Sequence, residues 1–389
     1  MHKTIRVLIL TAPFGNGHLS VAKEIQRELE TYPNVNVIQY DLYTEEYYYL
    51  TKFLRRYHLR QYKKGLSQWS YKYIYYNSGK LLKTRIGRLY ERFGRKRLIR
   101  KIKEVQPDLI LNTFPVNCSY YLKEAGIDLP VFTMITDYYA NENWIHPNLT
   151  CHFVASENVV DQLLNKGIAE QQVLLTGIPV REPFYQPKSK EEVEAIRKEH
   201  RIDPSHKVVL AVAGAKGVLP QFKLMAKRLS TLTDVTLLLV CGNQKKLYRQ
   251  LAKTFKDKPN VRVFPYVNDM DRLMAISDLM VTKPGGITIT ECAQMGLPLV
   301  LFKPIYGQEL ENARYFAKRE AAVVVHRMDE LVQAVQDILS DENRLAMMKK
   351  NIADIAQKDS AHRIVQRMLA ELGDRDENQE NQEVASGLV

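Results

Sequence analysis

Residues 279–302 alternate between short apolar runs, a glycine turn and a helical pattern, and this alternation limits the fold more than any other part of the sequence. Residues 279–282 and 299–302 have the length and composition of buried strands. Between them, Gly285 and Gly286 form a turn, and residues 288–295 follow as a helix that a glycine and a proline end. The stretch therefore predicts a βαβ unit of a parallel sheet.

Similar apolar runs, each followed by a polar or glycine-containing turn, recur along the chain in two series. Runs of this kind are typical of parallel strands that are buried on both faces. The sequence therefore predicts an α/β protein with two Rossmann-like domains that face each other across a cleft. The predicted strands are 5–12, 35–40, 109–113, 131–136, 152–155 and 173–176 in the first series, and 208–213, 235–241, 261–266, 279–282, 299–302 and 321–325 in the second.

The two series set the expected domain boundaries. Residues 1–176 are assigned to the first domain, 177–206 to a linker with a charged helix, and 207–358 to the second domain. Residues 359–372 are expected to form a helix that packs back on the first domain. The tail 373–389 is polar and rich in acidic, Asn and Gln residues, so we expect it to be disordered.

The turn at Gly285 and Gly286 has the chemistry of an anion site. The glycines let a ligand approach the backbone, and the first helical turn, which includes Ile287 and Thr288, offers N–H groups that suit phosphate. Glu291 lies one turn further along, where its carboxylate could accept hydrogen bonds from sugar hydroxyls such as those of a ribose.

Polar side chains follow the next predicted strand as well. Gln308, Glu309 and Asn312 come after Gly307 and could bind the hydroxyls of a hexose. Partners for phosphate, ribose and hexose in one stretch indicate a nucleotide-sugar site. The alternative is an ordinary βαβ unit with a tight turn, because a Gly-Gly turn alone is a weak signal.

A second glycine turn follows the first strand of the second domain. The backbone N–H groups at Gly214 and Gly217, together with Lys216, could bind a pyrophosphate. No Asp-x-Asp cluster stands at the end of a predicted strand. We therefore expect no metal ion, and no cofactor besides the nucleotide-sugar substrate.

His18 is the candidate catalytic residue of the first domain. It follows Gly17 at the start of a predicted helix and at the carboxyl end of the first strand, where α/β proteins bind ligands. The positive end of the helix dipole disfavours an imidazolium there, so the ring should be neutral and able to accept a proton. The alternative is a histidine that serves only as a cap or turn residue.

The loop after residues 131–136 offers a possible acceptor site. Asp137 follows the strand, and an aromatic loop that includes Trp144 comes next. Asp137 could instead cap a helix or loop. His146 precedes a proline, and we interpret it as a loop residue rather than a catalyst.

The positive charge of the chain is concentrated in residues 51–103. This segment has 18 Lys or Arg and one acidic residue, whereas the 389-residue chain has a net charge of +12, so the remainder is net negative. Eleven of the 22 tyrosines lie between residues 43 and 103, among these cations. The pattern favours an anionic membrane surface, with aromatic rings at headgroup level. A solvated helical face and nucleic-acid binding are the alternatives.

Two further features bear on where the protein works. The sequence has no apolar run of about 18 residues and no signal-peptide pattern before the first strand, so we expect a cytoplasmic protein. Its four cysteines are scattered singly, without metal-binding spacing, which fits a reducing compartment.

The chain resembles the GT-B glycosyltransferases related to plant monogalactosyldiacylglycerol synthase and the lipid II-forming GlcNAc transferase, and most of all the processive diacylglycerol glucosyltransferases of Gram-positive bacteria. The resemblance covers about residues 5–363. It rests on Lys-Pro-Gly-Gly-Ile-Thr-Ile-Thr-Glu at 283–291, Gly-Gln-Glu-Leu-Glu-Asn-Ala at 307–313, Gly-Asn-Gly-His at 15–18, and Thr136-Asp137 with Trp144. Tyr306 departs from the family pattern, which has Pro there.

The resemblance implies an inverting transfer of glucose from UDP-glucose to 1,2-diacylglycerol, and then to the glucosyl-diacylglycerol formed. It implies that His18 is the general base, that Arg181 lies near the nucleotide, and that Gly17, Asp137 and Trp144 border the acceptor. It also places residues 51–103 at the membrane, on the cytoplasmic face. A transferase acting on a polyprenyl-linked acceptor, a soluble UDP-sugar 2-epimerase and a non-catalytic sugar-nucleotide sensor are the alternatives.

Overall fold

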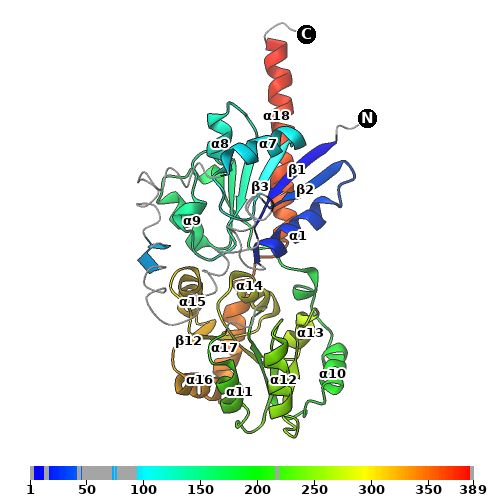
Figure 1. The fold of residues 1–389 in the computed structure, drawn as a ribbon, viewed down its shortest axis with the longest axis vertical. Helices are drawn as coiled ribbons and strands as arrows, with labels where there is room; N and C mark the ends of the chain where they lie inside the picture. The colour runs from blue at the N-terminus through cyan, green and yellow to red at the C-terminus, as the bar shows by residue number, and fades with distance from the viewer. Residues whose placement is uncertain are drawn as a thin grey trace. The chain divides into compact units, whose positions relative to one another are not determined.

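The computed structural model describes residues 4–12, 17–41, 45, 72–73, 75–76, 94–214 and 219–385. These residues form two compact units. The first unit holds the described residues up to 45, those from 73 to 180 and those from 357 onward, and the second holds Lys72 and residues 181–356. Each unit is built on a parallel six-stranded sheet (Figure 1). The structure thus confirms the predicted α/β architecture with two Rossmann-like sheets.

The sheet of the first unit has the order β2-β1-β3-β4-β5-β6, and all its neighbours are parallel. Its central strands are fully buried because helices cover both faces, which explains their uninterrupted apolar sequences. The strands are β1 (Ile5–Leu10), β2 (Val35–Tyr40), β3 (Leu109–Asn112), β4 (Val131–Met134), β5 (Cys151–Val154) and β6 (Val173–Leu175).

The helices of the first unit bury apolar residues at helical spacing. In α1 (Gly17–Leu29), Val21, Ile25 and Leu29 form the buried stripe. Helices α7 and α8 pack together over the opposite face of the sheet, against Leu10 and Ile110. The described helices after α1 are α7 (Arg95–Val105), α8 (Cys118–Glu124), the short 3-10 helices η1 (Glu142–Trp144) and η2 (Glu170–Gln172), α9 (Glu157–Leu164), and α18 (Ser360–Ala385).

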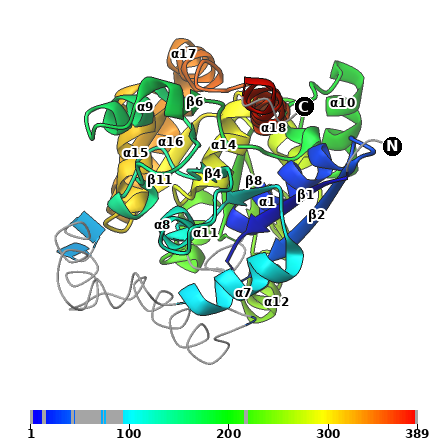
Figure 2. The same ribbon diagram turned by 90° about the horizontal axis from the view of Figure 1, so that it is seen from above.

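The C-terminal segment belongs to the first unit, where α18 lies against α1 (Figure 2). The side chains of Ile364, Val365 and Met368 are completely buried. The helix continues to Ala385. Part of the tail that the sequence predicts to be disordered is therefore helical, and its Glu, Gln and Arg residues are good helix formers even without an apolar stripe.

The sheet of the second unit has the order β12-β11-β10-β7-β8-β9 and is also parallel throughout. Its strands are β7 (Lys207–Val212), β8 (Val235–Val240), β9 (Val261–Phe264), β10 (Leu279–Thr282), β11 (Leu299–Phe302) and β12 (Ala322–Val325). The described helices are η3 (Glu182–Phe184), α10 (Lys190–Glu199), α11 (Phe222–Leu229), α12 (Lys245–Thr254), α13 (Met270–Ala275), α14 (Gly286–Met295), α15 (Gln308–Lys318), α16 (Met328–Ser340) and α17 (Glu342–Ala353). The segment predicted to be a linker thus supplies η3 and α10 to this unit.

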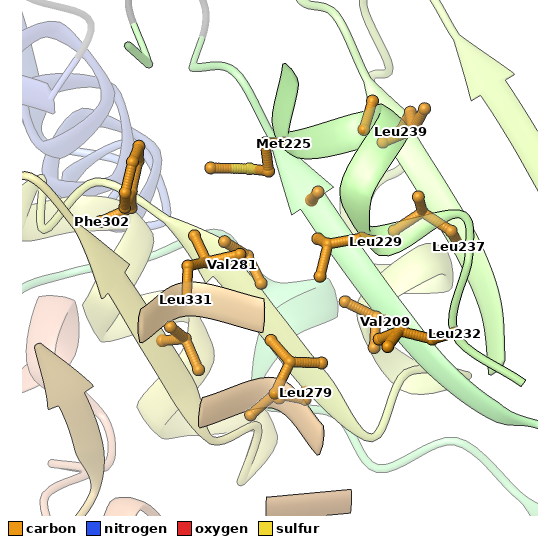
Figure 3. Packing of buried hydrophobic residues seen from close by; sticks show 14 of the residues in the cluster. Val209, Met225, Leu229, Leu232, Leu237, Leu239, Leu279, Val281, Phe302 and Leu331 are labelled. Atoms are coloured by element: carbon orange, nitrogen blue, oxygen red, sulfur yellow. The ribbon is translucent and has the colours of Figure 1, made fainter. Parts of the chain in front are cut away.

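One face of this sheet packs against α11, α12 and α16. Figure 3 shows side chains of this core, among them Val209 and Leu237 from the strands, Met225 and Leu229 of α11, and Leu331 of α16. Each of these five side chains is almost completely buried. The rigid sheet fixes where its strand ends lie, and those ends carry the candidate site.

Each sheet has one point where the strand order reverses. In the first unit it lies between β1 and β3, and in the second between β7 and β10. Ligands of open α/β sheets bind beyond the carboxyl ends of the strands at such a point. The segments that follow β1, β3, β7 and β10 are therefore where a site is expected.

Candidate active site

His18 lies beyond the carboxyl end of β1, in the first turn of α1. Its Nδ1 is 2.7 Å from the backbone oxygen of Thr113 and 3.1 Å from Oγ1 of Thr136. Thr113 directly follows β3, and Thr136 lies two residues beyond the end of β4. The strand ends on one side of the reversal point thus converge on a single imidazole ring.

The contact with Thr113 determines the tautomer of His18. A carbonyl oxygen can only accept, so Nδ1 carries the proton and donates it. In the neutral ring, Nε2 then carries the lone pair and is the basic nitrogen. The position of His18 was predicted from the sequence, but its two partners were not, because they lie 95 and 118 residues away along the chain.

Aromatic side chains surround the His18 ring. Phe114 meets it edge to face, with ring centroids 5.2 Å apart, and the Trp144 ring lies 6.1 Å away. Trp144 is almost fully buried and packs with Ile135 and Leu163. The structure therefore places the Trp144 ring beside His18, where it also packs in the hydrophobic core.

Two other predicted acceptor-site residues lie in the same place. Gly17 is the first residue of α1, next to His18. Asp137 follows Thr136 directly and is buried. His146 lies apart from this chemistry: its ring contacts the backbone oxygen of Asn143, and burial lowers the pKa of its imidazole. This agrees with its interpretation as a loop residue.

In the second unit, Gly285 precedes α14 beyond the end of β10. Its φ of −74° is available to any residue, and a Cβ added there would meet no described atom within 4 Å. The protein's own packing therefore does not require glycine at this position. The open position at Gly285 is compatible with a phosphate that approaches the first turn of α14, at Gly286, Ile287 and Thr288.

The neighbouring strand β7 ends in a turn at Gly214, whose φ of 80° favours glycine. Because β7 and β10 are adjacent, the turns at Gly214 and Gly285 lie at the same edge of the sheet. Lys216 and Gly217, predicted to contact a pyrophosphate, lie outside the described residues.

Glu309 and Asn312 are buried and hold the turn before α14. The Glu309 carboxylate forms an ion pair of 2.9 Å with Lys283 and accepts a hydrogen bond from the backbone N–H of Ile305. The Asn312 amide donates to the backbone oxygen of Pro284 at 3.2 Å. The sequence predicts both as sugar contacts, whereas the contacts seen here are within the protein.

Gln308 differs from these two residues. It is the first residue of α15 and half-buried. Glu309, Asn312, Ala313 and Phe316 are all buried and follow the i, i+3, i+4, i+7 spacing of a core-facing stripe. That spacing is visible in the sequence, and it places Glu309 and Asn312 on the core-facing stripe and Gln308 outside it.

Arg181 and Glu291 lie close enough to interact electrostatically. Burial raises the pKa of Glu291 to about 8; Arg181 opposes this rise, and Asp271 adds to it. Asp271 itself forms a largely buried ion pair with Lys188, 2.8 Å long. The guanidinium of Arg181 also lies over the Phe184 ring, 5.0 Å from its centroid. Lys188 thus forms an ion pair with a residue of α13, and Arg181 interacts electrostatically with a residue of α14.

Two kinds of feature are absent from the described residues. No helix among them is long and apolar enough to cross a membrane. No group of three or more His, Cys, Asp or Glu side chains in the same part of the chain could hold a metal ion.

Comparison with known families and proteins gives matches over nearly the whole chain. A model described as monogalactosyldiacylglycerol (MGDG) synthase matches residues 18–180, and one described as the glycosyltransferase family 28 C-terminal domain matches residues 208–367. A processive diacylglycerol beta-glucosyltransferase of Bacillus licheniformis is 36% identical, with 94% of each chain covered. The protein of the same description from Bacillus subtilis strain 168 is also 36% identical, over 95% of this chain and 96% of that one.

Solved structures share the fold at low sequence identity. MurG of Acinetobacter baumannii has a TM-score of 0.65 at 16% identity, covering 94% of this chain and 99% of that one. A UDP-GlcNAc 2-epimerase of Neisseria meningitidis, bound to UDP-GlcNAc, has a TM-score of 0.61 at 14% identity, covering 94% of this chain and 100% of that one. Transferases and epimerases therefore share this architecture, and the fold does not separate them.

Proposed function

The chain belongs to the family of processive diacylglycerol beta-glucosyltransferases, and we propose that it transfers glucose from UDP-glucose to 1,2-diacylglycerol and then to the glucosyl-diacylglycerol formed. Relatives with this description align over nearly the full length. An epimerase of the same fold is only 14% identical, so sequence favours the transferase. We expect the product to supply membrane glycolipids and the lipid anchor of lipoteichoic acid.

The observation that carries the proposal is the tautomer of His18. With Nδ1–H donated to Thr113, Nε2 is the atom that can accept a proton. In the proposed reaction Nε2 takes the proton of the lipid hydroxyl, whose oxygen attacks the anomeric carbon. The bond from that carbon to the diphosphate breaks, UDP leaves, and the configuration at the carbon is inverted.

The N-terminus of α14 supports the departure of UDP. The backbone N–H groups that follow Gly285 have no partner within the helix and offer hydrogen bonds to the charge that develops on the diphosphate. We assign the ribose to Glu291, the nucleotide side to Arg181, and the hexose to Gln308. Glu309 and Asn312 hold the turn in position. No metal ion is needed for these roles.

We propose that the enzyme works at the cytoplasmic face of the membrane, because its acceptor is a bilayer lipid. The basic segment 51–103 would bind anionic headgroups, each cation contributing about 1 kcal/mol. Most of this segment lies outside the described residues. Its described end, α7, buries Leu98 and Ile102 and keeps Lys96 and Lys103 on its other side.

The test is product analysis with the purified protein, labelled UDP-glucose and diacylglycerol. We expect labelled mono- and diglucosyl-diacylglycerol from the wild type and almost none from His18→Ala. Product from both proteins would remove His18 from the role of base. Turnover only with UDP-galactose or UDP-GlcNAc would correct the donor. Lipid product only with a polyprenyl-linked acceptor would correct the acceptor, and an isomerised UDP-sugar without any lipid product would indicate an epimerase.

A further inference from the structure

Helix α12 of the second unit carries a row of cations on its exposed side. Lys245, Lys246, Arg249 and Lys253 are all exposed. On an α-helix these positions fall within an arc of about 100° and extend along about 12 Å of the axis. Leu251 on the opposite side is buried in the core of the unit. The four cations therefore form one continuous surface, which we call the α12 basic face.

Nothing in the described structure neutralises this face. No acidic side chain among the described residues forms an ion pair with any of its four cations, whereas cations elsewhere in the unit do, as in Arg228–Asp329 and Arg272–Glu199. Helix α12 contains no acidic residue at all. Residues 245–258 together have six Lys or Arg and one acid, in a chain whose net charge outside residues 51–103 is negative.

The placement of these cations does not stabilise the helix. Lys245 and Lys246 occupy the first turn of α12, where the helix dipole is positive and disfavours a cation. Lys245 and Arg249, and likewise Arg249 and Lys253, are like charges at i, i+4 spacing, which also destabilises a helix. An anionic partner would turn both costs into a gain.

The neighbouring helix α11 extends the surface and adds an apolar side chain. Helices α11 and α12 contribute side chains to the same core cluster, so they cover the same face of the sheet (Figure 1). On α11, Lys223 and Lys227 are exposed and flank Leu224, which is 44% exposed. Cations around an exposed leucine fit the interface of a bilayer, where both headgroups and acyl chains are within reach.

We propose that the α12 basic face, with Leu224, binds the surface of an anionic phospholipid bilayer, as a membrane contact separate from residues 51–103. This rests on the proposed function, because an enzyme that acts on diacylglycerol must work at a bilayer. A nucleic acid fits less well. Single-stranded nucleic acids bind basic grooves by stacking on exposed aromatic rings, whereas Tyr248, the aromatic residue of α12, packs on the core.

The first test is flotation with vesicles of phosphatidylcholine, with or without phosphatidylglycerol. We expect Arg249→Glu/Lys253→Glu to weaken binding to the anionic vesicles by at least about 25-fold, because each lost cation is worth roughly fivefold. The matched control is Lys190→Glu/Lys198→Glu on α10, which makes the same charge change among Glu191, Glu192 and Glu194. It should bind nearly as well as the wild type. Equal binding by the α12 variant and the wild type would overturn the proposal.

The second test reports on the α12 surface itself. The native cysteines are all buried, so a polarity-sensitive thiol dye would label Gln250→Cys selectively. Anionic vesicles should shift its emission to the blue, and should leave the dye at Glu194→Cys on α10 unchanged. A shift with an RNA homopolymer and none with vesicles would overturn the assignment to a membrane.

Two controls distinguish this proposal from a role of the α12 basic face in donor binding and from the proposed enzymatic function. The α12 variant should bind UDP as tightly as the wild type; a large loss of UDP affinity with unchanged vesicle binding would assign the face to the donor site instead. Activity towards detergent-dispersed diacylglycerol, where no anionic bilayer is present, should survive in this variant. Absence of that activity in the wild type would count against the proposed function, whereas loss of vesicle binding alone concerns only the α12 basic face.

Discussion

Glu309 and Lys283 form an ion pair of 2.9 Å that joins the start of α15 to the segment before α14. The Glu309 side chain is only 3% exposed and that of Lys283 is 23% exposed. The pair lies beside the hydrogen bond from Asn312 to Pro284. Two side chains of α15 thus hold the backbone that leads into Gly285 and the phosphate-facing end of α14.

Breaking this pair should affect stability and donor binding together. In Glu309→Ala, the half-buried ammonium of Lys283 loses its ion pair with Glu309. We expect about 2 kcal/mol less free energy of unfolding, which is below the usual cost of a broken buried pair because Lys283 is partly solvated. The KM for UDP-glucose should rise, because the Gly285 turn loses its support. Urea unfolding and steady-state kinetics measure the two effects.

Gln308→Ala is the matched control for Glu309→Ala. Gln308 lies on the same helical turn but is half-buried at its start. Its removal should change the KM or the sugar preference and leave the free energy of unfolding nearly unchanged. If Glu309→Ala raised the KM at full stability, Glu309 would be a sugar contact after all.

Thr136 should support His18 as a base without touching the reacting atoms. In Thr136→Val, Nδ1 of His18 loses the Oγ1 contact at 3.1 Å and keeps Thr113. A hydrogen bond of this kind is worth about 1 kcal/mol, so we expect kcat to fall roughly fivefold. Thr136→Ser should retain most of the activity. A merely structural effect would lower stability in step with kcat and leave the pH profile of kcat unchanged, whereas a weakened base shifts that profile.

Much of this fold is predictable from sequence because buried parallel strands are near-continuous apolar runs. Each of the twelve described strands overlaps a predicted run, although β5 and β7 begin one residue earlier than predicted and several runs extend past the strand, as 131–136 does past β4. Thr136 and Thr11 remain buried beyond the last ladder residue, where they line the strand ends. A buried residue just beyond a strand therefore cannot be distinguished by its sequence pattern from a residue of the strand.

The site was predictable in its residue types and not in its contacts. Glycine turns at strand ends and a histidine at a helix start have local signatures, so His18 and Gly285 could be found. The partners of His18, Thr113 and Thr136, come from other strands, and only the sheet order brings them together. The role of Glu309 also depends on a tertiary contact, with Lys283, which polarity alone does not reveal.

Gly177 should tolerate no side chain. Its φ is 77°, and an added Cβ would lie 2.3 Å from Cβ of Gln357 and 2.9 Å from Oγ of Ser360. Gly177→Ala therefore combines left-handed strain of about 1 kcal/mol with overpacking of about 2 kcal/mol. Gly167 has a similar φ of 81° and nothing within 4 Å, so Gly167→Ala should lose only the first contribution. The losses in free energy of unfolding, measured with urea, should differ between the two variants by the overpacking cost. Equal losses would show that the residues around the start of α18 move to make room for the added methyl group.

Glu291 should make the stability of the protein depend on pH. Its pKa is about 8 in the folded protein against 4.5 for the free side chain, so between these values the folded state holds a proton that the unfolded state has released. Stability relative to Glu291→Gln should therefore be unaffected below pH 4.5, fall as the pH rises towards 8, and level off above it. Each pKa unit of difference corresponds to about 1.36 kcal/mol, so the full loss is a few kcal/mol.

Asp271→Asn tests the cause of this pH dependence. The Asp271 carboxylate raises the pKa of Glu291, so its neutralisation should lower that pKa and end the decline in stability at a lower pH. Lys188 would lose its ion-pair partner in this variant, and the Asp271→Asn/Glu291→Gln double variant contains the same loss, so comparing the two isolates the effect on Glu291. Urea unfolding from pH 5 to 9 on the wild type, Glu291→Gln, Asp271→Asn and the double variant separates the two. A decline that persists unchanged in Glu291→Gln would mean that another group titrates.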